Sequence, residues 1–267
     1  MFFPDIILAR HLEFHEAWSS VEHARIQAQL FPQTGATSVP IHEGAAVFCG
    51  EKSPLSQVYG LGLSGPVRAS DLDTIENFYR NRDRKVQVNL CPFADTSLPA
   101  LLSDRGYGVQ YFMNTYVRQV SPLDDQAPTV FGLKITVATT AEARMWYEQL
   151  GAGGDWAEPD GITFMTIRTA IKSRTRLFLA WQDGQPVGGG ALEVHDGVAA
   201  LMAADTLPDF RHQGIHTALM QVRLAAAADA GCELAMVHGS PGGQSQGNIL
   251  RSGFQLAYTS VALLRAL

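Results

Sequence analysis

Hydrophobic and polar residues follow two periods along this chain, one helical and one strand-like, and together they predict an α/β protein. Apolar residues at helical spacing over residues 5–30 predict a long amphipathic helix. Residues 58–80 predict a strand and then a helix that Ser70 caps. Short apolar runs at 86–91 and 234–238 predict strands, and each is followed by a proline and a further helix.

The second half of the chain predicts a mixed sheet. Its expected elements are strands at 135–137, 177–181, 186–194 and 198–207, and helices at 141–150 (capped by Thr140) and 162–172 around a turn-rich loop at 151–161. Asp183-Gly184 and Asp196-Gly197 are turn sequences that join the last three of these strands as hairpins. A strand–helix–strand–helix–strand order closes the chain, which is typical of an α/β domain.

The two halves of the chain end in the same way. Gly106-Tyr107 with Tyr111, and Gly253-Phe254 with Tyr258, each follow a predicted helix and open a long strand. Residues 121–132 contain two prolines and read as a linker. We therefore expect an internal duplication, with one domain at 1–122 and another at 130–267.

Composition and charge narrow the function. The net charge of -6 over 267 residues argues against nucleic acid as a partner, because neutralising phosphates requires clustered Lys and Arg. Three cysteines without a C-x-x-C pair indicate reduced, buried thiols, and neither they nor the eight histidines have the spacing of metal ligands. His11, His15 and His23 are expected on a solvated helix face. No signal peptide or membrane span is evident, so a cytoplasmic protein with no membrane partner is expected.

The sequence TLPDFRHQGIHT, residues 206–217, is the strongest functional signal. A strand leads through a glycine-containing turn directly into an alanine-rich helix. The first four N–H groups of a helix have no partner within it and carry partial positive charge, so this turn suits phosphate or pyrophosphate. Arg211 adds a permanent cation, and Gly214 lets a ligand approach the backbone. The pattern is neither a Walker loop nor a dinucleotide G-x-G-x-x-G motif.

This stretch resembles the acetyl-CoA loop of the GNAT acyltransferase superfamily, which typically reads Arg/Gln-x-x-Gly-x-Gly/Ala. Here the six positions are Arg211 to His216, and His216 replaces a small residue. PGGQSQGNILRSGFQLAYTSV, residues 241–261, resembles the last helix and strand of that family. The first half has the element order without the loop, so it resembles a degenerate copy in a tandem arrangement.

The resemblance implies two GNAT-like domains with the acyl-CoA N-acyltransferase fold, a mixed α/β sheet. It implies acyl transfer from acetyl-CoA, or a related acyl-CoA, directly to a small amine or aminoacyl acceptor, by a monomer or homodimer. The residues expected to bind the co-substrate are Thr206, Leu207, Arg211, His212, Gln213, Gly214, Ile215, His216, Thr217, Ser245 and Asn248. A non-catalytic acyl-CoA sensor or interaction module is the alternative.

The catalytic residues are less well defined by the sequence. Ile249 stands where family members often have a tyrosine that serves as general acid. Ser245, Tyr258 or water would therefore have to protonate the departing thiolate. Asp205 is the first candidate for a general base acting through water, and a structural strand-end carboxylate is the alternative. His238 is the second candidate, although a hydrogen-bonded structural histidine is also expected there.

Two further expectations concern loops. The acceptor is expected near Trp156, Glu158 and Asp160, whose carboxylates would receive a cation. The glycines at 188–190 follow a hairpin turn with no helix after it. A bulge or close packing is therefore expected there rather than phosphate binding.

Overall fold

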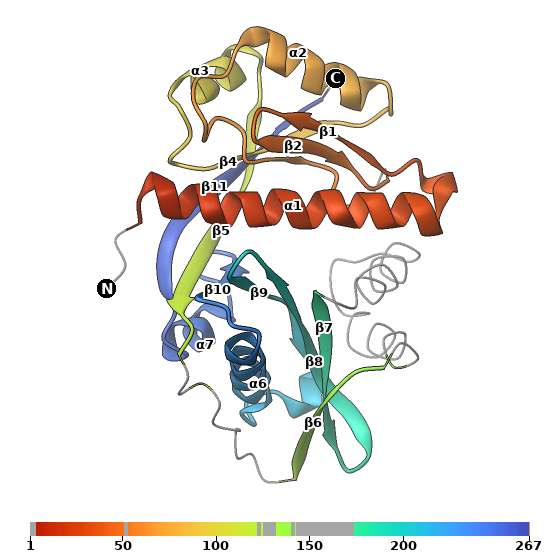
Figure 1. Cartoon of the computed structure of the whole chain (residues 1–267), viewed down its shortest axis with the longest axis vertical. Coiled ribbons are helices and arrows are strands. Elements are labelled where there is room, and N and C mark those ends of the chain that lie inside the picture. Colours follow the sequence, from red (N-terminus) through yellow and green to blue (C-terminus); the bar gives the residue numbers. More distant parts are fainter. Residues whose placement is uncertain are drawn as a thin grey trace. The chain divides into compact units, whose positions relative to one another are not determined.

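The computed structural model describes residues 4–50, 53–121, 124, 132–139, 142 and 174–266. The chain forms two compact units (Figure 1). Unit 1 comprises Met1–Thr115 and Leu256–Leu267, and unit 2 comprises Tyr116–Gln255. The chain therefore passes from unit 1 into unit 2 within one strand, β5 (Gly108–Gln119), and returns at the start of the last strand, β11 (Gln255–Arg265).

Unit 1 is a mixed sheet with three helices. Its strand order is β1-β2-β3-β4-β11-β5. The elements are α1 (Ile6–Leu30), η1 (Pro32–Thr34), β1 (Thr37–Ile41), β2 (Gly44–Phe48), β3 (Val58–Tyr59), α2 (Ala69–Arg80), β4 (Val86–Leu90) and α3 (Ser97–Asp104), followed by β5. The long helix expected over 5–30 is confirmed, whereas the hairpin of β1 and β2 was not expected.

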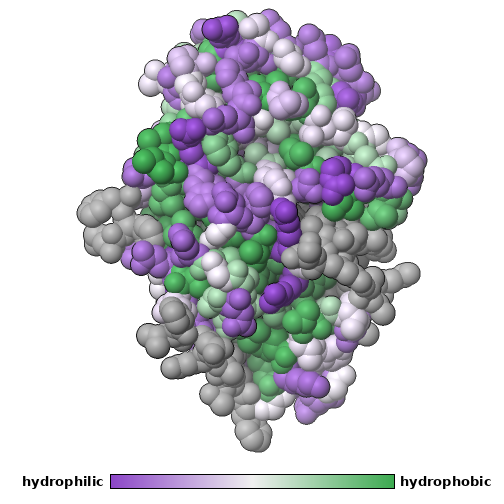
Figure 2. Space-filling view, in the orientation of Figure 1, coloured by the Kyte–Doolittle hydropathy of each residue, from purple (hydrophilic) through white to green (hydrophobic). Residues whose placement is uncertain are grey.

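Helix α2 shows how the sequence determines the packing of unit 1. Leu72, Ile75 and Tyr79 recur on one side of the helix and are fully buried. Its outward side is mostly hydrophilic (Figure 2). The expected cap at Ser70 is wrong: the helix begins at Ala69, because the carboxylate of Asp71 accepts the Arg68 amide at 2.8 Å.

Unit 2 has the strand order β6-β7-β8-β9-β10-β5. Its elements are β6 (Leu133–Val137), β7 (Thr175–Gln182), β8 (Gln185–His195), β9 (Val198–Thr206), η4 (Pro208–Phe210), α6 (Ile215–Asp229), β10 (Leu234–Gly239) and α7 (Gln246–Arg251). Both expected hairpin turns are confirmed. Asp183 and Gly184 have φ values of 50° and 78°, and Asp196 and Gly197 have 49° and 72°, the positive values that a two-residue type I′ turn requires.

The two units repeat one order of elements, which confirms the expected duplication at the level of the fold. Three antiparallel strands are followed by a helix, a strand parallel to the third, a short helix and a long strand. The parallel pair is β3–β4 in unit 1 and β9–β10 in unit 2.

The closing strands, however, are exchanged. β11, from the end of the chain, pairs with β4, and β5 lies beside β10. Both halves of the sequence end in a Gly-aromatic pair and a long strand. Because this pattern is the same in the two halves, it does not predict which sheet each strand joins. The division into domains at 1–122 and 130–267 stays a prediction.

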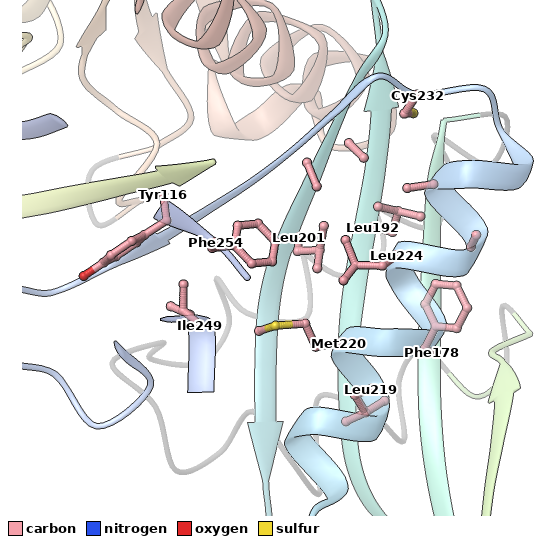
Figure 3. Packing of buried hydrophobic residues seen from close by; sticks show 14 of the residues in the cluster. Tyr116, Phe178, Leu192, Leu201, Leu219, Met220, Leu224, Cys232, Ile249 and Phe254 are labelled. Carbon is pink, nitrogen blue, oxygen red and sulfur yellow. The ribbon is translucent and has the colours of Figure 1, made fainter. Parts of the chain in front are cut away.

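The core of unit 2 lies between α6 and the sheet (Figure 3). Leu219, Met220 and Leu224 point from α6 toward Leu192 and Leu201 on β8 and β9. Tyr116, Ile249 and Phe254 extend the same core. Fully burying each such side chain stabilises the fold by about 1.5–3 kcal/mol.

Other expectations have mixed outcomes. Cys49, Cys91 and Cys232 are buried and free, as expected. His15 and His23 are both 2% exposed, so the expected solvated face is wrong for them; both lie on the buried side of α1. No helix in the described ranges is long and apolar enough to cross a membrane. The expected helices at 141–150 and 162–172, the loop at 151–161, and most of the linker fall outside the described residues.

Candidate functional site

The site lies where two parallel strands of unit 2 separate. β9 and β10 pair from Val198–Leu234 to Ala200–Met236. Beyond this point β9 continues to Thr206 and β10 to Gly239 without pairing with each other. A crevice at the carboxyl ends of parallel strands is a common place for a ligand in α/β proteins.

A cavity of about 680 Å³ lies in this region, within the size range of small-molecule sites. It is lined by the end of β9, the start of α6, and the loop and helix after β10. The lining residues are Ala204, Asp205, Thr206, Phe210, Arg211, His212, Gly214, Ile215, His216, Thr217, Ser240, Gly243, Gln244, Ser245, Asn248 and Arg251. The loop at 206–217 and the helix at 246–251, distant in sequence, therefore form one cavity.

The start of α6 presents uncapped amides to this cavity. Gly214 is the N-cap residue with φ of 84°, and no side chain caps the helix. Within the described part of the chain, the backbone amides of residues 213–217 donate no hydrogen bond. The first turn of α6 contains no acidic residue. His212 also has positive φ, 64°, which is typical of loops that curve around an anion. The helix start is thus suited to a phosphate group.

Two arginines on the cavity wall add positive charge. Arg211 donates from Nε to the carbonyl of Thr206 at 3.1 Å, which ties the loop back to the end of β9. Its Nη2 atom lies 3.8 Å from Asp205 Oδ1, a half-exposed ion pair of little energetic weight. Arg251 donates to Asn248 Oδ1 at 2.5 Å. Both residues line the same cavity as the start of α6.

A β-bulge in β9 shapes the opposite wall. Gly189 pairs with Asp205 and Ala191 with Met202, so two residues of β9, 203 and 204, face one residue of β8. Ala203 has φ of 49°, a left-handed conformation that costs a non-glycine residue about 1–2 kcal/mol. The bulge lies next to Ala204, Asp205 and Thr206 of the cavity lining.

Most of the residues predicted to bind the co-substrate line the cavity. Leu207 and Gln213 are the exceptions, and His238, the second candidate for the base, does not belong to the lining either. The Leu207 amide donates to the Val187 carbonyl at 2.9 Å, so it is already used within the sheet. The Gln213 side chain donates to the carbonyl of Asp209.

Candidate acid and base groups lie at the end of β9 and the start of α7. Asp205 accepts the Thr206 amide at 2.7 Å through Oδ1. The Thr206 hydroxyl is buried and has no hydrogen-bond partner in the described residues. Ser245 is the N-cap residue of α7, yet its side chain makes no capping bond. These hydroxyls therefore have hydrogen-bonding capacity to offer a ligand.

The position where the acid is usual, and the substitute acid Tyr258, both lie elsewhere. Ile249 is 1% exposed and packs with Tyr116 and Phe254, so its position faces the core (Figure 3). Tyr258 belongs to unit 1, where its hydroxyl donates to Glu13 at 3.0 Å. Burial, followed by the nearby Glu13 carboxylate, raises the pKa of Tyr258 well above its usual value. Tyr258 is thus a buried residue of unit 1 whose hydroxyl is satisfied within the protein.

His216 is the second residue of α6 and is neutral at physiological pH. Burial, with a smaller contribution from Arg223, lowers its pKa to about 4. Its Nδ1 atom is buried and has no partner in the part of the chain that is described. The ring is thus a polar group held uncharged in the cavity wall.

The glycines at 188–190 serve close packing, as expected. A Cβ at Gly188 would lie 3.0 Å from Ile215 Cγ2, and one at Gly190 would lie 2.9 Å from the guanidinium of Arg223. Sequence reasoning missed Arg223, which is 1% exposed. An arginine in a helix rich in alanine and leucine gives no sign of burial.

The corresponding helix start in unit 1 is different. The amide of Arg68 donates to Asp71, and the amide of Val67 donates to Ser97 Oγ at 2.8 Å. Asp71 is an acidic residue in the first turn of α2. The protein itself occupies and neutralises this helix start, in contrast to α6.

Comparison with known proteins identifies one domain of this chain. The model of the acetyltransferase (GNAT) family matches residues 139–254. This chain contains a GNAT domain. The matched range of the GNAT domain includes the β9 bulge, the 206–217 loop and α7, and the match supports an acyl-CoA-dependent acyltransferase activity.

Solved structures extend the likeness in fold to both units. A GCN5-related N-acetyltransferase from Kribbella flavida is 22% identical, covers 91% of this chain and 94% of its own, and has a TM-score of 0.66. A tandem GNAT protein from the clavulanic acid biosynthesis pathway is 15% identical, covers 83% and 78%, and has a TM-score of 0.63. A GCN5-related N-acetyltransferase from Sphaerobacter thermophilus is 17% identical, covers 78% of this chain and 71% of its own, and has a TM-score of 0.58. No curated protein matches the sequence.

Proposed function

We propose that this protein transfers an acetyl group from acetyl-CoA directly to a small amine or aminoacyl acceptor, with one co-substrate site in unit 2. The observation that carries the proposal is the uncapped start of α6 beside a cavity between β9 and β10. CoA is an extended molecule with a pyrophosphate and a polar arm. The free amides of residues 213–217 suit the pyrophosphate. The end of β9, which no longer pairs with β10, suits the amides of the arm.

The chemistry requires few groups from the protein. A neutral amine attacks the thioester carbonyl, the carbonyl oxygen gains charge, and the thiolate leaves and takes a proton. Ala203 and Ala204 have no partner residues in β8. Their backbone amides are our candidates for donors to that oxygen. Positioning alone lowers such barriers by several kcal/mol.

Proton transfer is assigned to groups at the cavity wall. Asp205 is the candidate base, acting through water, because its carboxylate lies at the end of β9 and is 40% exposed. Ser245 is the candidate acid for the thiolate. His238 stays a second candidate for the base.

The direct test is release of CoA thiol from acetyl-CoA in the presence of a panel of primary amines and aminoacyl compounds. We expect release that depends on both the protein and one class of amine. Binding of CoA without release for any amine would favour the alternative, a non-catalytic sensor or interaction module.

Gly214→Val tests the co-substrate site. A β-branched residue is strained at φ of 84° and crowds the amides, so we expect at least a tenfold loss of CoA affinity by calorimetry. Gly231, at the other end of α6, has φ of 72° with open space around it. Gly231→Val imposes the same backbone strain and is expected to keep wild-type affinity. Equal affinities of the two variants would refute the assignment of the loop.

A further inference from the structure

The bulge in β9 requires an explanation, because it interrupts the ladder between β8 and β9 inside the sheet. The register on one side joins Gly189 to Asp205, and that on the other joins Ala191 to Met202. Backbone groups at such a site lose their regular partners, and a buried carbonyl without a partner is unfavourable.

Arg223 bonds to the backbone at one end of this bulge. Its Nη1 atom lies 3.3 Å from the Ala191 carbonyl of β8 and 3.3 Å from the Met202 carbonyl of β9, the register pair that borders the bulge. Its Nε atom donates to the Leu219 carbonyl of α6 at 3.0 Å. One guanidinium therefore joins the helix to both strands at the position where their register changes.

Gly190 makes room for this guanidinium. It is the residue of β8 opposite the bulge, and a Cβ there would approach Cζ and Nη1 of Arg223 to 2.9 Å. The φ of Gly190 is not positive, so space rather than backbone conformation requires glycine. Gly190 and Arg223 are thus two parts of one arrangement.

Burying the charged side chain of Arg223 costs desolvation free energy, so its hydrogen bonds require an explanation. Burial lowers its pKa to about 10, so it remains charged at neutral pH. Among the described residues it has no carboxylate partner; all its hydrogen bonds go to backbone carbonyls. Such a charge is retained where its hydrogen bonds fix a geometry that an apolar residue cannot fix.

We infer that Arg223 is a positioning residue that locks the β9 bulge and so sets the direction of the backbone from Ala203 to Thr206 along the cavity. This rests on the proposed function for its effect on catalysis. The α6 amides that suit the pyrophosphate belong to another element of the lining, so Arg223 affects the reacting end of the co-substrate more than its anchored end.

The test compares Arg223→Met with Arg223→Lys and with Arg176→Met, an exposed arginine on β7. Arg223→Met is expected to lower kcat by about 10–100-fold, since small misplacements of reacting groups cost that much. The KM for acetyl-CoA and the calorimetric affinity for CoA should change less than about threefold. Arg223→Lys, which keeps a donor and the charge, should recover part of the rate, and Arg176→Met should match the wild type.

Hydrogen exchange separates this role from general stability. Deuterium uptake in Arg223→Met should rise in a peptide covering 198–207 and stay unchanged in one covering 255–265. Gly190→Ala crowds the guanidinium while Arg223 is kept, and it should give the same pattern of uptake. This variant therefore tests the inference even if Arg223→Met does not fold.

Two results would overturn the inference: wild-type uptake at 198–207 in both variants, or equal loss of kcat and CoA affinity without rescue by lysine. If no amine is accepted, the proposed function fails. The exchange pattern and the CoA affinity still decide the role of Arg223 in that case.

Discussion

His216 connects the anion-binding loop to the interior of unit 2, because its ring lies in the cavity wall while its Nδ1 atom is buried. A histidine whose pKa is lowered to about 4 on folding is neutral in the folded state over a range where the unfolded chain is already protonated. Folding must then exclude a proton, so stability falls as pH decreases from about 6.5 to about 4.

We expect His216→Gln to flatten this pH dependence. The wild type should lose about 2–3 kcal/mol more than the variant between pH 6.5 and pH 4, since each pKa unit corresponds to about 1.4 kcal/mol. Urea unfolding at a series of pH values measures the difference. His212→Gln, at an exposed position of the same loop, is the control. Parallel pH profiles of wild type and His216→Gln would contradict the prediction.

At the residue scale, the sequence predicts some site residues much better than others. The loop from Arg211 to Thr217 is contiguous, and its glycine and cation have a direct physical meaning. Arg223 and Gly190 gain their meaning only when a helix and a bulge bring them together. Ile249 is a case in which spacing misleads. Its spacing from Gly253 matches the position of the general acid, but the structure places its side chain in the core.

Among the elements, the contact of α6 with β8 and β9 is the most demanding. Gly188 faces α6 so closely that a Cβ would meet Ile215, Leu219 and the Asp205 carbonyl at 3.0–3.3 Å. Overpacking of this kind typically costs about 1–3 kcal/mol. The contact allows α6 to lie near the sheet, which brings its first turn to the end of β9.

Gly188→Ala is therefore expected to lower the free energy of unfolding by about 1–3 kcal/mol. It should also weaken CoA binding, because Ile215 and Asp205 both line the cavity. Chemical denaturation and calorimetry measure the two effects. Gly108→Ala in β5 is the control, since a Cβ there meets nothing within 4 Å. Unchanged stability of Gly188→Ala would show that α6 can move away at little cost.

The elements that the sequence missed have atypical turns. The hairpin of β1 and β2 turns through His42, with φ of 54°, where Asn or Gly is usual. Pro40 lies within β1, which is tolerated because β1 is at the edge of its sheet. By contrast, the Asp-Gly turns of unit 2 were predicted because residue type and conformation agree there.

At the scale of the whole molecule, the duplication leaves one helix start free and the other occupied. The Asp71 carboxylate accepts the Arg68 amide at the start of α2 and places negative charge where a phosphate would have to lie. We predict that CoA binds with a stoichiometry of one per chain in a calorimetric titration. Asp71→Asn should keep that stoichiometry, because Ser97 Oγ still accepts the Val67 amide at this helix start. Two sites per chain in the wild type would contradict the assignment of unit 1 as a degenerate copy.

The exchange of closing strands also affects how the protein is made. β4 pairs with β11 between residues about 170–180 positions apart. During synthesis, the strand that covers the edge of β4 leaves the ribosome only after about 170 further residues have been made. Until then the nascent first half has an open sheet edge, which is prone to pairing with other chains. The order of translation thus delays completion of unit 1, although its residues are made first, and gives nascent-chain chaperones a long interval in which to act.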